Sequence, residues 1–218
     1  MSSIFTKNFK VLLAKQVQNW TDVSLNTTLS DDKKNYIYVV LGKQLPWNTG
    51  TETSPTPSET ESEIFDLYKR GIYAKQVSYE NSSVVVARNN WTANTVYPSY
   101  DNLQDSLYKN PNTAFYVITD EFNVYKCIAN NNGQASTYKP TSINPGVVFN
   151  TADSYIWKYM YTLSGDEQLR FMTESFIPVK TLTQDDNSLQ WQVQEDAVPG
   201  AIYNIVVTNG GGGYLYQN

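Results

Sequence analysis

Two short strand-like segments separated by a four-residue turn place the strongest constraint on the fold of this chain. Residues 114–119 and 124–129 are rich in β-branched and aromatic side chains and have the alternation of β-strands. Residues 120–123, DEFN, lie between them, and turn residues at this spacing favour a hairpin. Because so short a connection cannot carry a parallel crossover, the two strands must pair antiparallel. The sequence therefore predicts an antiparallel sheet.

Three further segments have the composition of strands. Residues 84–87 and 155–163 are rich in β-branched and aromatic side chains. Residues 36–41, YIYVVL, form an uninterrupted apolar run that ends at Gly42, and this pattern is typical of a buried strand. We therefore expect a mainly β chain in which residues 36–41 are buried.

Helical spacing of apolar residues occurs in three places. Residues 1–20 repeat apolar side chains every three or four positions, which predicts an N-terminal helix with one apolar face. Residues 48–58 are rich in Pro, Thr and Ser and are expected to form an exposed loop. Ser58 and Glu61 fit a capping box, so a helix of about a dozen residues is expected to follow within this long loop. A short helix, begun by Ser164 or Gly165, is also expected at residues 166–172.

The end of the chain has a different pattern. Residues 183–200 are mostly polar, and we interpret them as a strand edge or an interdomain connection. Residues 202–207 alternate like a strand before the glycines at 210–213. We therefore predict one domain over residues 1–182, and a connection leading to a further β-rich region over residues 183–218. The chain is accordingly expected either to be the front part of a longer protein or to begin a second β-rich region near its end.

The residues that most often perform chemistry are scarce in this sequence. There are no histidines, which removes Ser-His-Asp and Cys-His nucleophilic sites. The single cysteine, Cys127, excludes zinc-thiolate and iron-sulfur sites, and its apolar surroundings indicate a buried small side chain. Adjacent carboxylates occur mostly where turns or helix starts are expected, so turn formation and capping explain them better than a catalytic pair does. We expect no enzymatic activity, no cofactor and no metal.

Charge and hydropathy also limit the partners. The net charge is −5 and no run of Lys or Arg exceeds two residues, so nucleic acid is not expected as a partner. No segment approaches the roughly 20 apolar residues needed to cross a bilayer, and the N-terminus lacks the pattern of a signal peptide. Seventeen tyrosines and five tryptophans suit half-wet contacts between proteins, although tyrosine is also simply a good strand former. Protein partners are the expectation that remains.

Four segments share their order and spacing with a known family. They are YIYVVLGKQLPW at residues 36–47, ARNNWTANTVYPSY at 87–100, VYKCI at 124–128 and ADSYIWKYMYTL at 152–163. In this arrangement the chain resembles the gene-eight-type baseplate wedge family of T4-like contractile-tailed bacteriophages. The N-terminal helix and the glycine-rich end depart from that pattern, so family contacts made there are not carried over.

The resemblance implies a fold and a role. It implies a mainly β (α+β) subunit, an antiparallel β-sandwich with helices in long loops, here with an added N-terminal helix. It also implies pairing with a second copy and contacts with other baseplate wedge proteins in the virion tail, after assembly in the host cytoplasm. The expected function is to hold neighbouring baseplate proteins together during tail assembly and contraction. A receptor- or glycan-binding tail module is the alternative, and a cell-wall hydrolase is the least favoured class.

The motif residues have two interpretations. Gly42 is expected to permit a turn after the strand, Pro46 to fix its exit, and Trp47 and Trp91 to fill the adjoining core. A partner-facing role is the alternative for Trp47, Tyr97, Tyr100 and Trp191. The complete set of candidate interface or motif-core residues is Gly42, Pro46, Trp47, Arg88, Trp91, Tyr97, Pro98, Tyr100, Trp157 and Trp191.

Overall fold

The computed structural model describes most of the chain as two compact units, Met1–Val84 and Val85–Asn218. The described residues are 7–21, 36–42, 60–101, 114–179, 181–182, 184–198, 200, 202, 205 and 211–213. The fold is mainly β with antiparallel sheets and a few short helices, as expected from the sequence. The predicted boundary between residues 182 and 183 stays a prediction.

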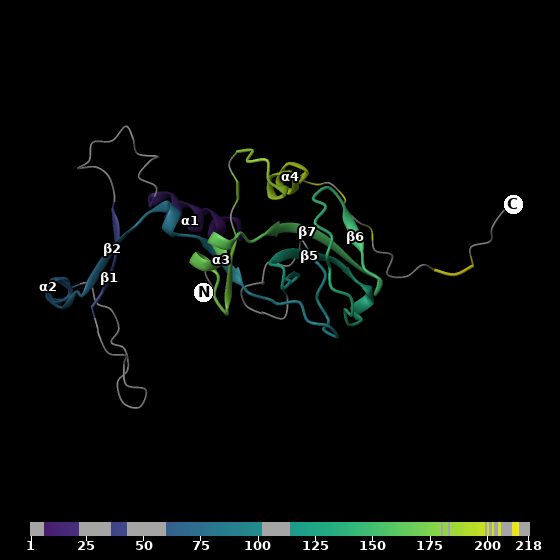
Figure 1. Cartoon of the computed structure of the whole chain (residues 1–218), viewed down its shortest axis with the longest axis horizontal. Coiled ribbons are helices and arrows are strands. Elements are labelled where there is room, and N and C mark those ends of the chain that lie inside the picture. The colour runs from purple at the N-terminus through teal and green to yellow at the C-terminus, as the bar shows by residue number, and fades with distance from the viewer. Residues whose placement is uncertain are drawn as a thin grey trace, which may run out of the picture. The chain divides into compact units, whose positions relative to one another are not determined.

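The second unit is built on a four-stranded sheet with the order β4-β5-β7-β6 (Figure 1). Its strands are β4 (Tyr116–Ile118), β5 (Asn123–Asn130), β6 (Val148–Asn150) and β7 (Tyr155–Thr162), and every neighbouring pair is antiparallel. The hairpin of β4 and β5 and the strand β7 confirm the sequence prediction. The three-residue strand β6 was not predicted, because so short a segment shows no period.

Aromatic side chains fill one face of this sheet. Tyr125 lies opposite Tyr159 and Cys127 opposite Trp157, so all four side chains share a face. The ring of Trp157 is fully buried and stacks on Tyr155 with ring centroids 5.5 Å apart. Burial raises the pKa of the Cys127 thiol to about 12, so the thiol stays protonated at neutral pH, as expected for a buried structural cysteine.

A smaller apolar cluster lies where a second, two-stranded sheet joins the unit. This sheet pairs β3 (Val84–Ala87) with β8 (Phe176–Val179). The cluster contains Ile118, Val124 and Ile177, and Val86 packs against it. Strand β3 was predicted from its valines, whereas β8 was missed.

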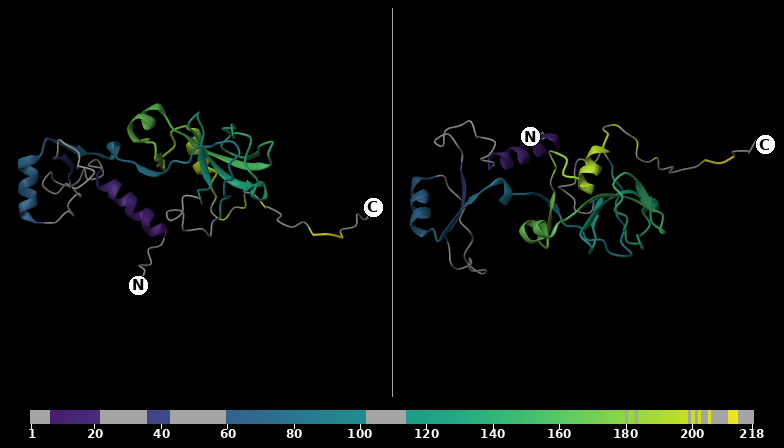
Figure 2. Two further views of the ribbon diagram at one scale, coloured as in Figure 1. Left: turned by 90° about the horizontal axis from the view of Figure 1, so that it is seen from below. Right: turned by 45° about the horizontal axis from the view of Figure 1, so that its top comes forward.

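Two short helices complete the second unit. Helix α3 (Gly165–Phe171) begins with a capping box in which Ser164 and Glu167 bond each other's backbone N–H groups, which confirms the helix predicted there. Helix α4 (Leu189–Glu195) corrects the interpretation of residues 183–200 as a strand edge or connection. Two views show α4 lying against the strands of this unit (Figure 2).

Local signals explain why α4 forms. Ser188 caps it by accepting a hydrogen bond from the Trp191 backbone N–H at 3.0 Å. Leu189 and Val193 are four residues apart and therefore share a helix face, and Val193 is buried in the aromatic core. The glutamines between them are good helix formers, so the polar composition that suggested a strand edge or a connection is equally compatible with a helix.

The first unit contains α1 (Lys7–Trp20), β1 (Ile37–Leu41), α2 (Glu61–Arg70), β2 (Tyr73–Val77) and the 3₁₀ turn η3 (Tyr79–Asn81). Strands β1 and β2 pair antiparallel, from Ile37 opposite Val77 to Leu41 opposite Tyr73. The prediction that residues 36–41 are buried is wrong, because β1 has a single partner strand among the described residues and its side chains are half-buried or exposed.

Some predictions fall outside the described residues. They concern Pro46, Trp47, the loop at 48–58 with its capping residue Ser58, and most of the strand at 202–207. Helix α2 occupies the place at which the loop-borne helix was expected, beginning at Glu61. Among the described helices, none combines the length and apolar character that a membrane span requires.

Asparagine supplies most of the unusual backbone in the turns. Among the described residues, four of the six non-glycine positions with positive φ are asparagines, at 94, 131, 132 and 187, with φ between 47° and 63°. Asparagine tolerates this left-handed region better than most side chains because its short amide can bond the local backbone. Part of the asparagine content therefore serves chain reversal.

Replacing Trp157 with alanine tests whether the aromatic face is the core of the second unit. Since the indole is fully buried, Trp157→Ala is expected to lower the free energy of unfolding by about 3 to 5 kcal/mol. Urea unfolding followed by near-ultraviolet circular dichroism measures the loss. Trp20→Ala is the matched control: Trp20 is 52% exposed, so its loss should stay below about 1 kcal/mol. Equal effects of the two changes would contradict the assignment.

Candidate interaction surface

Three of the motif residues lie together in the core of the second unit. Tyr97 is 2% exposed, and its ring meets that of Trp157 edge to face at 5.8 Å. Its hydroxyl accepts a hydrogen bond from the Thr92 backbone N–H at 2.6 Å. Trp91 packs against the same cluster and donates from its indole N–H to the Ser136 hydroxyl at 3.3 Å. The side chains of Trp91, Tyr97 and Trp157 therefore all pack in or against the core of the second unit.

The remaining described motif residues do not join this cluster. Tyr100 lies on the surface, where its ring packs edge to face on Phe115 and holds the Lys126 ammonium 3.3 Å from its centroid. Arg88 is half-buried and donates from Nε to Asn90 Oδ1 at 2.8 Å and from Nη1 to the Thr173 carbonyl at 3.2 Å. Pro98 and Trp191 are half-buried, and Gly42 is exposed at the end of β1.

Asp153 holds the segment at residues 136–138 by hydrogen bonds that were not predicted from the sequence. Its Oδ2 accepts hydrogen bonds from the Ser136 hydroxyl and from the backbone N–H groups of Thr137 and Tyr138, at 2.7 to 3.0 Å. Its Oδ1 accepts from the Thr151 hydroxyl. Since Ser136 also accepts from Trp91, this carboxylate fixes the position of a motif residue indirectly.

These hydrogen bonds determine the charge state of Asp153. Partial burial alone would raise the pKa of this carboxyl, but the bonds from Thr151, Tyr138, Thr137 and Ser136 outweigh it and lower the pKa from 3.8 to about 2. The folded-state pKa therefore lies below the unfolded-state value. The carboxylate contributes its stability above about pH 4, and the contribution is lost as the pH falls toward 2.

The Asp153→Asn variant tests this assignment through its pH dependence. The variant is expected to lose about 1 to 2 kcal/mol of unfolding free energy at pH 7, and the difference from wild type should shrink below about pH 3. Urea unfolding at a series of pH values measures both quantities. Glu195→Gln, at an exposed position in α4, serves as the control and should match wild type throughout. A pH-independent loss in Asp153→Asn would mean that packing, and not charge, explains its effect.

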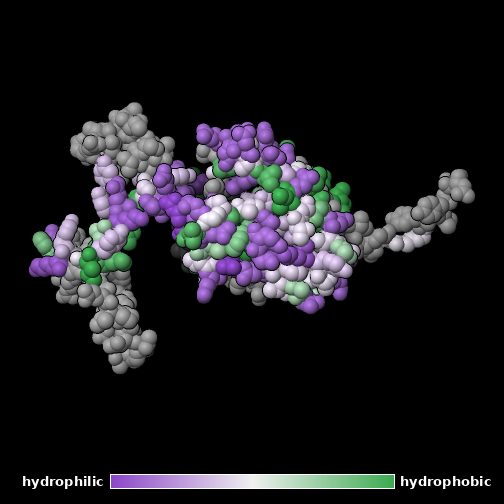
Figure 3. Space-filling view, viewed as in Figure 1, coloured by the Kyte–Doolittle hydropathy of each residue, from purple (hydrophilic) through white to green (hydrophobic). Residues whose placement is uncertain are grey.

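The first unit presents a different kind of surface. Five apolar side chains on β1, β2 and the link before β2 are each between 52% and 58% exposed: Tyr38, Val39, Leu41, Ile72 and Tyr73. Helix α1 adds Leu12, Val17 and Trp20, which are also more than half exposed. Hydrophobic atoms of this unit are visible at the surface in Figure 3. Exposed apolar surface of this kind is typical of sites that contact another molecule.

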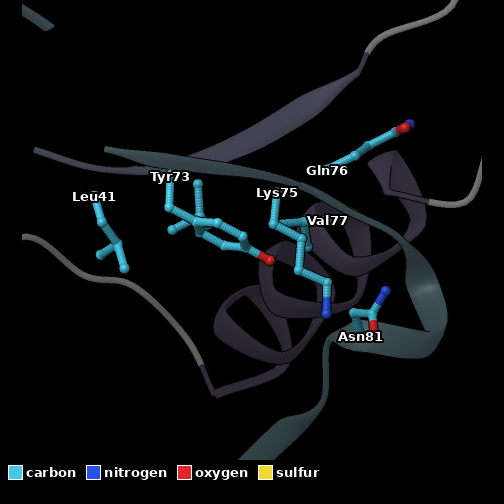
Figure 4. Close-up of a pocket in the computed structure, with 7 residues that line it drawn as sticks. Leu41, Tyr73, Lys75, Gln76, Val77 and Asn81 are labelled. Carbon is cyan, nitrogen blue, oxygen red and sulfur yellow. The ribbon is translucent and has the colours of Figure 1, made fainter. Parts of the chain in front are cut away.

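One face of the β1–β2 pair is hollowed. The register places Leu41 beside Tyr73, Val39 beside Lys75 and Ile37 beside Val77 on this face. Leu41, Tyr73 and Lys75 project from one side of the ribbon, whereas Gln76 points to the other (Figure 4). Leu41, Tyr73 and Lys75 line a shallow hollow of about 270 Å³. The face is apolar at the Leu41 end and carries the Lys75 ammonium at the other, so it can bind a side chain of a partner protein.

The acidic pairs of the described chain occupy structural positions. Asp120 and Glu121 form the β4–β5 turn and accept from Lys139, and Asp166 and Glu167 lie in the first turn of α3. Asp185 and Asp186 accept from the backbone N–H groups just before α4. Within the described residues, no group of three His, Cys, Asp or Glu side chains could hold a metal ion.

No family model matches this chain, and no curated protein matches it. Its own geometry therefore defines its class: an antiparallel, mainly β protein with an aromatic core in one unit and an exposed apolar surface in the other.

Proposed function

We propose that this chain is a structural, non-enzymatic subunit of a contractile-tail baseplate wedge, which holds neighbouring baseplate proteins through protein-protein interfaces. The exposed apolar surface of β1, β2 and α1 carries the proposal. Burying apolar side chains gains about 25 cal/mol of free energy per Å² of apolar surface, and the surface of a partner protein can bury them. The four motif segments that resemble the gene-eight-type wedge family are the reason for proposing the baseplate wedge as the assembly.

The edge of β1 supports the same role. Among the described strands β1 pairs only with β2, so the outer edge of Ile37–Leu41 has backbone N–H and C=O groups without a strand partner. No charged residue or proline interrupts this edge, whereas Lys75 lies in β2. Since proteins usually protect free edges with charges or prolines, an unprotected edge suits the addition of a strand from another chain.

The second unit fits a rigid body in this scheme. We further propose that its two sheets act as the layers of a small β-sandwich, because Ile118 and Val124 of the larger sheet pack with Ile177 and Val86 of the smaller one. A body packed with aromatic rings deforms little, so contraction of the tail would rearrange the interfaces and leave the body intact.

The composition agrees with interfaces of low charge. Only 17% of the residues are charged, so the rims of the contacts are expected to be neutral and polar. Binding of this kind depends weakly on salt. The proposed partners are other baseplate wedge proteins and a second copy of the chain, in the virion tail.

Changing two exposed apolar residues of β1 to threonine tests the proposal. The double variant Val39→Thr/Leu41→Thr places a β-branched strand former at both positions but removes the apolar surface. It is expected to weaken association with the flanking tail proteins, or with a second copy, by at least about tenfold, because each 1.4 kcal/mol changes affinity tenfold. Sedimentation velocity of the chain alone and with its purified tail neighbours measures the effect.

Leu169→Thr is the matched control. Leu169 is 90% exposed on α3, in the other unit, and is changed to the same residue. This control should assemble like wild type, and near-ultraviolet circular dichroism should show all the variants folded. A wild-type chain that stays monomeric among all its tail neighbours would overturn the proposal.

A further inference from the structure

The second unit has a hollow that the proposed structural role does not use. It has a volume of about 590 Å³ and is lined by Arg88, Asn90, Trp91, Thr119, Asp120 and Lys139, with Ile118 and Phe122 as further apolar walls. This volume lies in the range of small-molecule sites, roughly 300 to 1,000 Å³. All of these residues belong to one unit, so the hollow is defined within a single body.

Backbone hydrogen bonds fix the walls of the hollow. Residues 89–91 run alongside β4: the Trp91 N–H donates to the Ile118 carbonyl at 2.9 Å, and the Ile118 N–H donates to the Asn89 carbonyl at 2.8 Å. The turn after β4 is closed by the Phe122 N–H donating to the Thr119 carbonyl at 3.0 Å. Lys139 ties this turn to a neighbouring segment by binding Asp120 Oδ1 at 2.7 Å. The site is therefore preorganised, which lowers the entropic cost of binding.

Arg88 brings an uncompensated positive charge to the hollow. Its guanidinium has five N–H donors, and its hydrogen bonds to Asn90 and Thr173 use Nε and Nη1. In the described part of the chain no carboxylate forms an ion pair with it, whereas Asp120 is already paired with Lys139. Donors remain that can bind a carboxylate in a two-pronged arrangement.

Thr119 adds a buried polar group. The residue is 5% exposed, and its hydroxyl makes no hydrogen bond of normal geometry. The Glu121 carboxyl, whose pKa this hydroxyl helps to lower, is its nearby acceptor. Buried polar groups in proteins are nearly always well paired, so a hydroxyl with so weak a contact in the lining of a hollow can bond a ligand or solvent group as well. The Asn90 amide, whose oxygen accepts from Arg88, offers its N–H groups as well.

The remaining walls are flat and apolar. The rings of Trp91 and Phe122 border the polar groups, and Ile118, whose side chain is buried in the core, lines the hollow beside them. Trp91 cannot swing away, because it packs against the core and its indole N–H is bonded to Ser136. The ligand must therefore combine an apolar face with hydroxyl groups and one negative charge. An acidic pyranose has all three features.

We propose that this hollow binds a carboxylate-bearing sugar, with the carboxylate on Arg88, the ring against Trp91, and hydroxyl groups at Thr119, Asn90 and Asp120. A phosphate dianion fits less well than a singly charged carboxylate, because Asp120 in the same lining repels the larger charge more strongly and Lys139 is engaged with two carboxylates. The site lies apart in sequence from the β1–β2 surface, so it adds a recognition function to the proposed structural one.

Saturation-transfer NMR and calorimetry on the full chain test the proposal with defined probes. The probes are methyl β-D-glucuronide, methyl β-D-galacturonide and N-acetylneuraminic acid, with methyl β-D-glucoside as the neutral comparison. At least one acidic sugar is expected to bind, and the glucoside at least about fivefold more weakly. Arg88→Gln should weaken the acidic sugar about tenfold or more and change the glucoside little.

Thr119→Val separates binding from folding. Valine has nearly the same shape and removes a hydroxyl that makes no hydrogen bond of normal geometry, so the variant should be nearly as stable as wild type. It is nevertheless expected to weaken the sugar about fivefold or more. Arg170→Gln is the matched control for Arg88→Gln, because Arg170 lies on α3 and does not line the hollow.

Two results would overturn the sugar site. One is the absence of binding by all three acidic sugars at roughly 10 mM, about tenfold above a dissociation constant of 1 mM. The other is binding that Arg88→Gln and Thr119→Val leave unchanged. Neither result bears on assembly, because the variants that test assembly change β1 in the other unit.

Discussion

The pairing of β5 with β7 is the interaction on which the second unit depends. It places Tyr125 beside Tyr159 and Cys127 beside Trp157, and so gathers the large rings on one face of the sheet. Tyr97 and Val193 reach the same core from segments far away in the sequence. Because the core is made of long-range contacts, the unit gains its stability only when distant segments meet. The segment that carries Arg88 and Trp91 is held in place by this same sheet, so the candidate sugar site depends on it as well.

In the proposed structural role, the two units would have different tasks. One buries its aromatic side chains, whereas the other leaves Val39, Leu41 and Tyr73 more than half exposed on a two-stranded sheet. Such a sheet is marginally stable in water by itself, and covering it with a partner would stabilise both molecules. Folding and assembly would then be coupled in the first unit and separate in the second. This difference explains how one chain can present a firm body together with an adaptable contact surface.

Local patterns in the sequence predicted those elements that have local causes. The hairpin at residues 120–123 and the capped helix after Ser164 follow from turn and cap chemistry, and the structure confirms both. The prediction that β1 is buried is wrong, because an apolar run in the sequence does not reveal whether another layer of the protein covers it. Asp153 was missed for a related reason: it is bonded to residues 136–138, and no local signal announces contacts over such a separation.

The asparagine turns have a consequence for the unfolded chain. Asn94, Asn131, Asn132 and Asn187 hold positive φ, a conformation that glycine adopts without strain. A glycine at each turn would raise the conformational entropy of the denatured chain, and folding would then cost about 0.4 to 1 kcal/mol more per site. Asparagine is slightly strained in the native turn, but its denatured state has fewer conformations to lose. The backbone at these turns is therefore already partly restricted in the denatured chain. This restriction lowers the entropy cost of folding for a protein whose core is formed by segments distant in sequence.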